Sequence, residues 1–419
     1  MAATPPVTLT SWAEVHDAFR AKDLRQAGYT EGAIVMADCL LDLHGHEHRE
    51  RRRIENRLFR RDVFAHWEHE VLGATIAATL DPFVAAGGGD LTVIGYRSAM
   101  NLTATIAGVD HDITDTTATE RLYGIVKTFS AGATLAHSTR DKDEVRAEVR
   151  AAMDAFHDEL YLSSLERRRA LVAEADGDAT AEAALPHDVL TTLVRHRERL
   201  GLTPEVQFRE ICFYLQAGAH STANAFVHTV DELLRHGETH PDDLERARHD
   251  LGFVQRCMHE SLRLDPASPV AVRTALADVV LGSGRELPAG TTVVLDLTAA
   301  NRDPSVFGDD AETFRPRRAV PEGVPPWGAS FGGGTHACIG AELDGGLEPP
   351  RISPTDDRAA SGATGGAAGD VVGEDHLFGT VAVMTHAFLA AGGRQDPAEA
   401  PALDPTSSRR HFSSYPVVF

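Results

Sequence analysis

The stretch ASFGGGTHACIGAEL, residues 329–343, places three consecutive glycines shortly before a single cysteine, Cys338. Glycine permits tight turns and lets a bulky group approach the backbone closely. The residues after the cysteine are able to begin a helix, and a helix N-terminus favours the thiolate form of a thiol. A thiolate at the end of a glycine-rich loop, facing a large flat group, suits the axial ligand of haem iron. A buried structural cysteine beside a flexible loop is the alternative explanation.

The composition is that of an ordinary globular chain of 419 residues, of which 42% are hydrophobic and 24% charged. Its formal net charge of −22 is unfavourable for binding nucleic acid or an anionic membrane. The cysteines are far apart and form no C-x-x-C pair: Cys39, Cys212, Cys257 and Cys338. This spacing predicts neither a disulfide framework nor a zinc ribbon, and scattered thiols suggest a reducing compartment. We find no secretory signal and no uncharged apolar stretch of about 18 residues, so we expect a cytoplasmic protein without a membrane span.

Hydrophobic periodicity predicts a mostly helical chain up to about residue 265. Residues 60–84 carry apolar side chains on one helix face, and residues 204–236 form a long helical candidate that should be buried on nearly every side. After Pro266, short runs of Val, Thr and Leu are broken by Gly and Pro, which is typical of small strands. Residues 344–373 are rich in Gly, Ala, Pro and Asp, and we expect a flexible low-complexity insertion there.

The cysteine stretch matches the pattern F-x-x-G-x-x-x-C-x-G, through Phe331, Gly334, Cys338 and Gly340. It resembles the haem-binding loop of the cytochrome P-450 family, the haem-thiolate monooxygenases. The resemblance implies that Cys338 is the metal ligand and that the cofactor is haem b, iron protoporphyrin IX. It also implies cofactor contacts from Phe331, Gly332 and Gly340.

Two further segments stand in the order expected for this family. HESLRLDP contains Glu260 and Arg263, an E-x-x-R whose spacing places both charges on one helix face. FRPRR supplies Phe314, Pro316 and Arg318, which match F-x-P-x-R. A lone E-x-x-R is more often a solvated pair, but in the family it is buried and linked to an arginine of a later loop. The resemblance therefore implies that Arg318 joins the pair.

The segment AGAHSTANA, in the long helix, resembles the family's oxygen-binding stretch A-G-x-[DE]-T-[TS]. Ala217 and Gly218 fit, because small residues leave room for dioxygen and the haem. Two positions depart, since His220 stands in place of an acid and Ser221 in place of the usual threonine. The Ser221 hydroxyl can still hydrogen-bond oxygen or water, while His220 is either a proton carrier or a structural histidine bonded to a neighbour. We group Thr222 with these catalytic candidates, although we expect a structural role for it.

The segment HGHEHRERRR, residues 44–53, admits a metal cluster of His44, His46 and His48, or a basic nucleic-acid patch. Alternating histidines lie on different faces of a helix, so coordination by all three requires an extended strand. The resemblance implies instead the family's H-x-x-x-R motif, formed by His48 and Arg52, with both side chains reaching haem propionates.

Two more positions match propionate-binding residues of the family: Arg273, in PVAVRTA, and His336, two residues before the cysteine. With His48 and Arg52 they place four cationic or donor groups around two carboxylates. Charge-assisted hydrogen bonds of this kind are strong.

The resemblance extends from about residue 8 to the end of the chain. It implies the family's fold, a mostly α triangular helical prism with a small β region, as a single haem domain over residues 1–419. Only residues 1–47 precede His48, so we expect the family's first helix and first strands to be missing or abbreviated. The insertion at 344–373 interrupts the helix that should follow the cysteine, and we expect this helix to restart near Asp375.

The leading functional hypothesis is a soluble bacterial-type monooxygenase. It would insert one oxygen atom from O2 into a small or medium-sized organic substrate, by hydroxylation, epoxidation or dealkylation. Its electrons would come from a ferredoxin and an NAD(P)H-dependent ferredoxin reductase, and Leu215 and Ala219 would face the substrate. The second hypothesis is a peroxide-using or redox-neutral haem-thiolate enzyme, because the acid at position 220 is absent. The third is a non-catalytic haem-binding member of the family.

Overall fold

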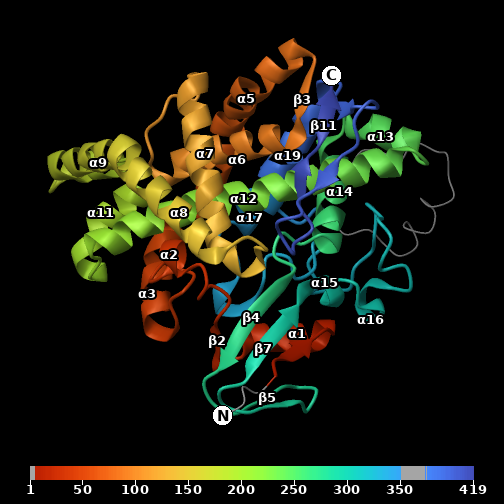
Figure 1. Ribbon diagram of the computed structural model, residues 1–419, viewed down its shortest axis with the longest axis horizontal. Helices are drawn as coiled ribbons and strands as arrows, with labels where there is room; N and C mark the ends of the chain where they lie inside the picture. The colour runs from red at the N-terminus through yellow and green to blue at the C-terminus, as the bar shows by residue number, and fades with distance from the viewer. Residues whose placement is uncertain (1–4, 351–372, 374) are drawn as a thin grey trace.

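A computed structural model describes residues 5–350, 373 and 375–419, and Figure 1 shows the course of the chain. The first helices are α1 (Trp12–Arg20), α2 (Ala33–Met36), α3 (Gly45–Glu55), α4 (Arg61–His66), α5 (Gly73–Ala86), α6 (Leu91–Ala107), α7 (Thr116–Ala133), α8 (Lys142–Phe156), α9 (Leu162–Ala175), α10 (Ala179–Ala183) and α11 (Val189–Leu200). The later helices are α12 (Pro204–Gly237), α13 (Pro241–Ala247), α14 (Leu251–Leu264), α15 (Leu297–Ala300), α16 (Pro304–Phe307), α17 (Ala341–Gly345) and α19 (Thr380–Ala390).

The strands are short. They are β1 (Val7–Leu9), β2 (Leu24–Gln26), β3 (Gly88–Asp90), β4 (Val270–Ala275), β5 (Val279–Val280), β6 (Glu286–Leu287), β7 (Thr292–Asp296), β8 (Arg394–Gln395), β9 (Ala402–Leu403), β10 (Phe412–Ser414) and β11 (Pro416–Val418). Short 3-10 or π helices stand between some of these elements: η1 (Asn56–Leu58), η2 (Trp67–Leu72), η3 (Leu135–His137), η4 (His157–Tyr161) and η5 (Gly334–His336). The expected fold class, mostly α with a small β region, is confirmed.

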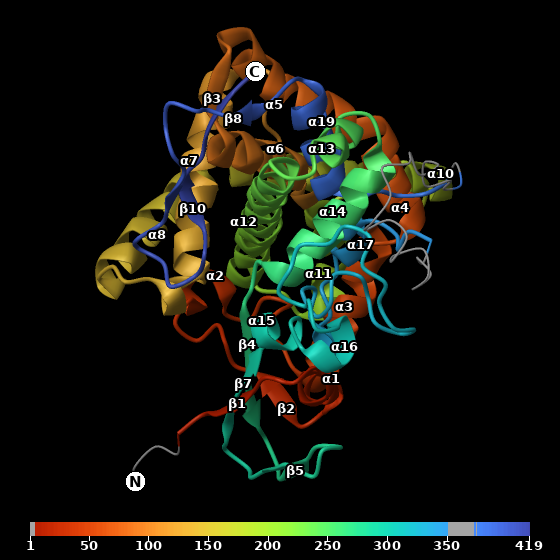
Figure 2. The same ribbon diagram turned by 90° about the vertical axis from the view of Figure 1, so that its right-hand side faces the viewer.

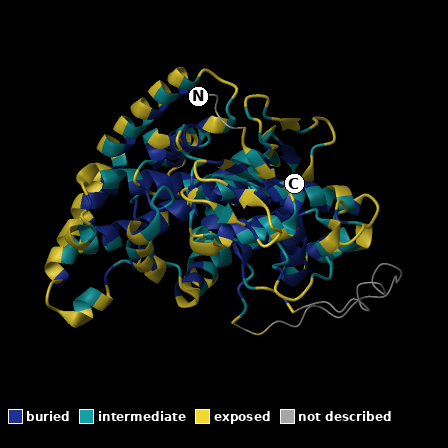
Figure 3. Cartoon of the chain, turned by 90° about the horizontal axis from the view of Figure 1, so that it is seen from below, coloured by how far each residue is buried: buried dark blue, intermediate teal, exposed yellow. Residues whose placement is uncertain are grey.

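The long helix α12 runs through the centre of the molecule, and α6, α7, α14 and α19 pack around it (Figure 2). The Thr203 hydroxyl caps its start by accepting a hydrogen bond from the Val206 amide, at 3.2 Å, and Pro204 occupies the first turn. Most residues from 211 to 230 are buried, as the scarcity of charges predicts, and Figure 3 shows the buried residues concentrated in the interior. In the part of the chain that the structure describes, no helix combines the length and apolar character needed to cross a membrane.

The main sheet has the strand order β1-β7-β4-β2 and lies at the end of the molecule opposite the C-terminus (Figure 1). Strands β1 and β7 are parallel, and the other neighbours are antiparallel. The register places Arg273 of β4 opposite Gln26 of β2 and Val293 of β7. Before His48 the chain forms α1 and the strands β1 and β2, which have three residues each. The expectation that the family's first helix and first strands are missing or abbreviated stays a prediction.

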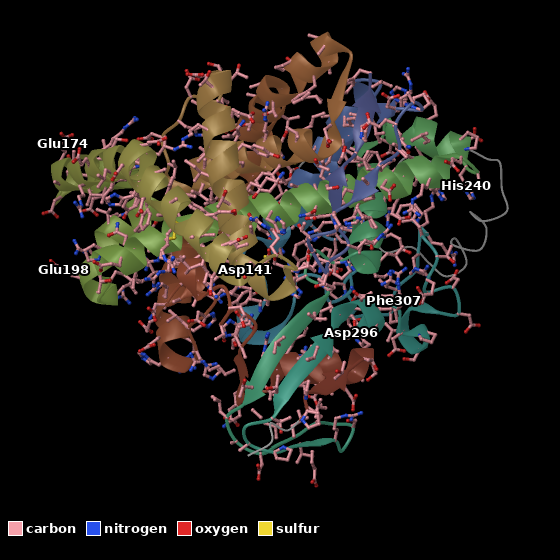
Figure 4. The ribbon with its side chains drawn as sticks, viewed as in Figure 1. Asp141, Glu174, Glu198, His240, Asp296 and Phe307 are labelled. Atoms are coloured by element: carbon pink, nitrogen blue, oxygen red, sulfur yellow. The ribbon has the colours of Figure 1, made fainter. Side chains whose placement is uncertain are left out.

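The E-x-x-R residues form a buried charge network at the end of α14. Arg263 donates from Nε and Nη2 to the two oxygens of Glu260, at 2.8 and 2.7 Å. Arg318 donates from Nε to Oε1 of Glu260 at 2.9 Å, as the resemblance implied. Arg263 also donates to the Asn301 carbonyl at 2.7 Å and lies 5.1 Å above the ring of Phe307, which Figure 4 labels. The pair is therefore structural and joins α14 to the later loops that lead to the cysteine.

The expected insertion lies between α17 and α19. Residues 351–372 and 374, the larger part of the predicted 344–373 insertion, lie outside the described residues. The helix that we expected to restart near Asp375 begins at Thr380. Helix α17 ends after five residues, so α17 and α19 are separate elements.

The two ends of this segment are held side by side. The Leu347 amide donates to the Leu377 carbonyl at 2.8 Å. Gln255 of α14 donates from Nε2 to both carbonyls, at 2.9 Å for Leu347 and 3.1 Å for Leu377. The Thr380 hydroxyl donates to the Leu343 carbonyl at 3.0 Å. Helices α17 and α19 therefore remain packed together in spite of the sequence between them.

Candidate functional site

A cavity of about 320 Å³ lies between α12, α6, β4 and the loop that ends at Cys338. Every site residue predicted from the sequence lines it: His48, Arg52, Ala217, Gly218, His220, Ser221, Thr222, Arg273, Phe331, Gly332, His336, Cys338 and Gly340. The fold thus brings together residues from four separate segments. Leu215 and Ala219, which we expected to face the substrate, are instead buried in the core and do not line the cavity.

The glycine-rich loop folds tightly against α1. Gly334 has a φ of 64°, in the left-handed region, and a Cβ at this position would overlap the Phe19 carbonyl oxygen. A Cβ at Gly333 would lie 3.1 Å from Cβ of Phe19. The Cys338 amide donates to the Phe331 carbonyl at 2.8 Å and closes the loop. The glycines are therefore needed for the approach of α1, which the sequence alone did not indicate.

The thiol of Cys338 is exposed toward the cavity, whereas the other cysteines are buried. Desolvation by the surrounding protein raises the pKa of the Cys338 thiol to about 11, and the charge of Asp344 acts in the same direction. The Gly340 amide and the Arg52 guanidinium act against this rise in the pKa. The net direction is opposite to the one expected from a following helix, because desolvation outweighs the helix end. A coordinating metal ion deprotonates a thiol, so the site remains suited to a thiolate ligand.

Two histidines lie beside the thiol with unused ring nitrogens. The rings of His48 and His336 have centroids 4.1 Å apart. Nε2 of His48 and both ring nitrogens of His336 are buried and have no hydrogen-bond partner among the described residues. Burial, followed by neighbouring positive charges, lowers the pKa of His48 to about 4 and that of His336 to about 3. Both rings therefore have hydrogen-bonding capacity for a group that enters the cavity.

Two arginines line the cavity and have no carboxylate partner in the part of the chain that the structure describes. No ion pair of Arg52 or Arg273 occurs within the described ranges, and Arg273 donates only to the Val272 carbonyl, at 3.0 Å. Desolvation lowers the pKa of Arg273 to about 10. Uncompensated guanidinium groups in a buried wall are unfavourable, and an anion between them relieves that cost. The two propionates of a haem fit this set of donors.

The opposite wall is the small-residue stretch of α12. A Cβ at Gly218 would lie 2.6 Å from Oγ1 of Thr103, so this glycine lets α6 approach α12 closely. The Ser221 hydroxyl lines the cavity and donates to the Ala217 carbonyl at 2.6 Å. Because a hydroxyl hydrogen rotates freely about the C–O bond, Ser221 can also donate into the cavity.

The His220 ring lies 5.1 Å from the ring of His411, centroid to centroid. Asn224 donates from Nδ2 to the His220 carbonyl at 2.7 Å and lies 3.5 Å from its Nδ1, while Nε2 is buried without a partner among the described residues. Burial, followed by the charge of Arg409, lowers the pKa of His220 to about 3. The ring is therefore neutral near pH 7, and its two predicted roles, proton carrier and structural residue, both stay predictions.

The cavity wall includes polar residues that the sequence analysis did not single out, among them Tyr29, Asp344 and Arg409. Asp344 accepts a hydrogen bond from the Thr222 hydroxyl at 2.9 Å, which gives Thr222 the structural contact expected of it. Asp344 stands six residues after the cysteine, within α17, and this short spacing is a signal that could have indicated it. Tyr29 and Arg409 lie in segments without a motif, so only the folded chain identifies them.

Comparisons with known proteins agree with this arrangement. The family model described as cytochrome P-450 matches residues 221–343. The self-sufficient cytochrome P-450 monooxygenase CYP505E3 of Aspergillus terreus is 32% identical over 178 residues, which cover 36% of this chain and 16% of that protein. The crystal structure of CalO2 is similar in fold, with a TM-score of 0.71 and 21% identity over 98% of this chain and 90% of that one.

An intact type IV self-sufficient cytochrome P-450 monooxygenase is also similar, with a TM-score of 0.70 and 18% identity over 98% of this chain and 48% of that one. The chain thus spans only part of the length of both self-sufficient proteins. The matched residues 221–343 include the E-x-x-R network and the cysteine loop, and the fold match extends over nearly all of the chain. The chain belongs to the cytochrome P-450 family.

Proposed function

We propose that this chain is a haem-thiolate monooxygenase that inserts one oxygen atom from O2 into an organic substrate. The observation that carries the proposal is a cavity-facing thiol, Cys338, beside four basic side chains that have no acidic partner among the described residues: His48, Arg52, Arg273 and His336. A monoanionic sulfur ligand next to a site for two carboxylates is the donor set of a b-type haem. Residues 1–419 would form one haem domain.

In this proposal Cys338 binds the iron, while Arg52, Arg273 and the two histidines hold the propionates. When bound, the haem would supply the redox chemistry that activates oxygen, and the Cys338 thiolate would donate electron density to it. Phe331, Gly332 and Gly340 would contact the porphyrin from the cysteine side. Ala217 and Gly218 would leave space on the α12 side.

Two residues of α12, Ser221 and His220, would control proton transfer into the cavity. Ser221 holds a proton at Oγ, now shared with the Ala217 carbonyl, and rotation of the hydroxyl turns it toward the cavity. His220 is neutral near pH 7 and would position water rather than donate a proton from a charged ring. The apolar side chains of Leu102, Ile106 and Phe213 would exclude bulk water and hold the carbon body of the substrate.

The electrons would arrive from a ferredoxin and an NAD(P)H-dependent ferredoxin reductase. Two of the similar proteins are named self-sufficient, and the chain matches only part of each. A reductase within the same polypeptide is therefore the alternative electron source. A cytoplasmic location and the absence of nucleic-acid and membrane partners belong to the same proposal.

A peroxide-using enzyme is the second candidate, and His220 favours it. The position where the family stretch carries an acid here holds a neutral ring, which weakens proton delivery to oxygen. Turnover with ferredoxin, its reductase and NADH, compared with turnover with hydrogen peroxide, separates the two candidates. Activity with peroxide alone would exclude the monooxygenase.

The first test of the proposal is the CO difference spectrum of the dithionite-reduced protein. We expect the red-shifted Soret band of thiolate ligation. Cys338→Ala should abolish this band, whereas Cys257→Ala, which removes a thiol buried in α14, should keep it. A band at the wavelength of a neutral ligand, or a thiolate band that survives Cys338→Ala, would contradict the assignment of the ligand.

A further inference from the structure

The cavity contains a third arginine, Arg409, apart from the two arginines assigned to the propionates. Its charge acts on the α12 side of the cavity: after burial, Arg409 is the largest cause that lowers the pKa of His137 and of His220. Arg409 comes two residues before His411, whose ring lies 5.1 Å from the ring of His220 on α12. Arg52 lies on α3 and Arg273 on β4, so Arg409 reaches the cavity from a different element.

No acid neutralises Arg409 in the part of the chain that the structure describes. Its Nε is buried and has no hydrogen-bond partner within residues 5–350, 373 and 375–419, and its Nη1 makes one long contact, 3.4 Å to the Ala267 carbonyl. Asp404, on the same hairpin, instead accepts hydrogen bonds from the amide and hydroxyl of Thr406, at 2.8 and 2.6 Å. A buried guanidinium without a counter-charge is costly, so its presence calls for an anionic partner.

The hairpin between β9 and β10 holds Arg409 in a fixed place. The neighbouring Arg410 pairs with Asp265 at 2.7 Å, and the Arg410 carbonyl accepts a hydrogen bond from Nε2 of His228 at 2.8 Å. The Ser408 amide donates to the His137 carbonyl, also at 2.8 Å. These contacts join the hairpin to α14, α12 and the η3 turn. Because the backbone on both sides of Arg409 is held in this way, only its side chain must be ordered when it binds a ligand.

The surfaces beside Arg409 suit a substrate with an apolar body. Leu102 and Ile106 of α6, Ala133 of α7 and Phe213 of α12 line the same cavity. Tyr29 lines the cavity together with Arg409 and Arg273, and both arginines lower its pKa against the rise that burial causes. Its hydroxyl is a second donor near the guanidinium.

We propose that Arg409 binds the carboxylate of an organic acid substrate and thereby orients its apolar body toward Ser221. This assignment rests on the proposed monooxygenase function and names the substrate class for it. A carboxylate fits better than a phosphate, because one guanidinium forms two parallel hydrogen bonds with a carboxylate and balances a single charge. A phosphate monoester carries nearly two charges and would leave one uncompensated.

The test is calorimetric binding to the haem-loaded protein of two acids and the alcohols of the same skeleton: decanoate with decanol, and phenylacetate with phenylethanol. We expect at least one acid to bind about tenfold or more tightly than its alcohol, since hydrogen bonds to charged groups are the strong ones. Arg409→Gln should abolish this preference and leave the affinity for the alcohol unchanged. Arg409→Lys keeps the charge without the planar fork and should retain part of the preference.

Arg394→Gln is the matched control, because it removes the same charge from an exposed residue of β8 that does not line the cavity. It should keep the preference for the acid. Failure of both acids to bind, equal binding of acid and alcohol, or a preference that survives Arg409→Gln would overturn the assignment. A normal CO spectrum in the wild type with any of these results would leave the proposed function intact. Loss of haem in Arg409→Gln would show a propionate contact instead and would also overturn it.

Discussion

The hydroxyl of Thr222 donates a hydrogen bond of 2.9 Å to Oδ1 of Asp344, which joins α12 to α17 at the wall of the cavity. Desolvation raises the pKa of Asp344 to about 7, and the Thr222 hydroxyl acts against the rise. An aspartate in an unfolded chain has a pKa of about 3.9. A carboxyl group beside the proposed haem therefore changes its charge near neutral pH.

Asp344→Asn should make the stability of the protein depend less on pH. Between about pH 4 and pH 7 the folded protein keeps a proton on Asp344 that the unfolded chain releases, so this contribution to stability is lost as the pH rises. Asparagine does not ionise. We therefore expect the variant to exceed the wild type at pH 8 by about 1–3 kcal/mol in the free energy of unfolding, and by less at pH 5. Urea unfolding at the two pH values measures the difference.

Thr222→Val tests the hydrogen bond itself. Removing the donor leaves the ionised carboxylate of Asp344 without its partner, which should cost about 1–3 kcal/mol at pH 8. The cost should be smaller at pH 5, where Asp344 is protonated, and smaller again in the Asp344→Asn background. An equal cost in all three settings would mean that Thr222 acts through packing and not through the carboxylate.

Gly334→Ala should be strongly destabilising, since a Cβ there would overlap the Phe19 carbonyl oxygen and the backbone is left-handed, with a φ of 64°. Gly284 is the matched control, because its φ is 83° and no atom lies within 4 Å of the Cβ position. We expect a cost of about 1 kcal/mol at Gly284 from backbone conformation alone, and at least about 3 kcal/mol at Gly334. Urea unfolding and haem content measure both. Similar costs at the two positions would contradict the role of α1 in shaping the loop.

Glu260→Gln should disrupt the core near the cysteine loop, because Glu260 is the only acid among the described residues that pairs with Arg263. Removing one partner of a buried ion pair typically costs about 3–5 kcal/mol. The control is Glu159→Gln, in the exposed pair of Glu159 with Arg121, where a much smaller change is expected because solvent screens the pair. Thermal unfolding of the haem-loaded proteins measures both. A small change for Glu260→Gln would mean that Arg263 finds another counter-charge.

The family motifs predicted the parts of the site that depend on short spacing. His48 and Arg52 lie one turn apart in α3, and the cysteine loop closes onto Phe331, as a local pattern can specify. The sequence predicted a lowered pKa for the Cys338 thiol, and this prediction was wrong. Desolvation raises the pKa, and it depends on every segment around the sulfur and not on the helix that follows it.

The remaining polar groups were not predictable because they come together only through long-range folding. Arg409 reaches the cavity on a hairpin near the end of the chain, held by contacts to His137, His228 and Asp265. The helix after the insertion begins at Thr380, where α17 and α19 meet. These positions depend on tertiary packing, which the local sequence does not specify.

The substitution His220→Asp tests two proposals at once: that the acid absent from α12 limits proton delivery, and that Arg409 binds a carboxylate. Arg409 and Lys127 both lower the pKa of His220, so their positive field would favour the ionised form of an aspartate at this position, against the desolvation that raises the pKa of a buried carboxyl group. Turnover with ferredoxin, its reductase and NADH should rise if the absent acid limits proton delivery. Affinity for the carboxylate ligand should fall by about tenfold, because the new carboxylate competes for Arg409. His220→Asn has the same shape without the charge and should do neither. Equal losses of affinity in the two variants would show that the shape of the ring, and not the charge beside Arg409, controls binding.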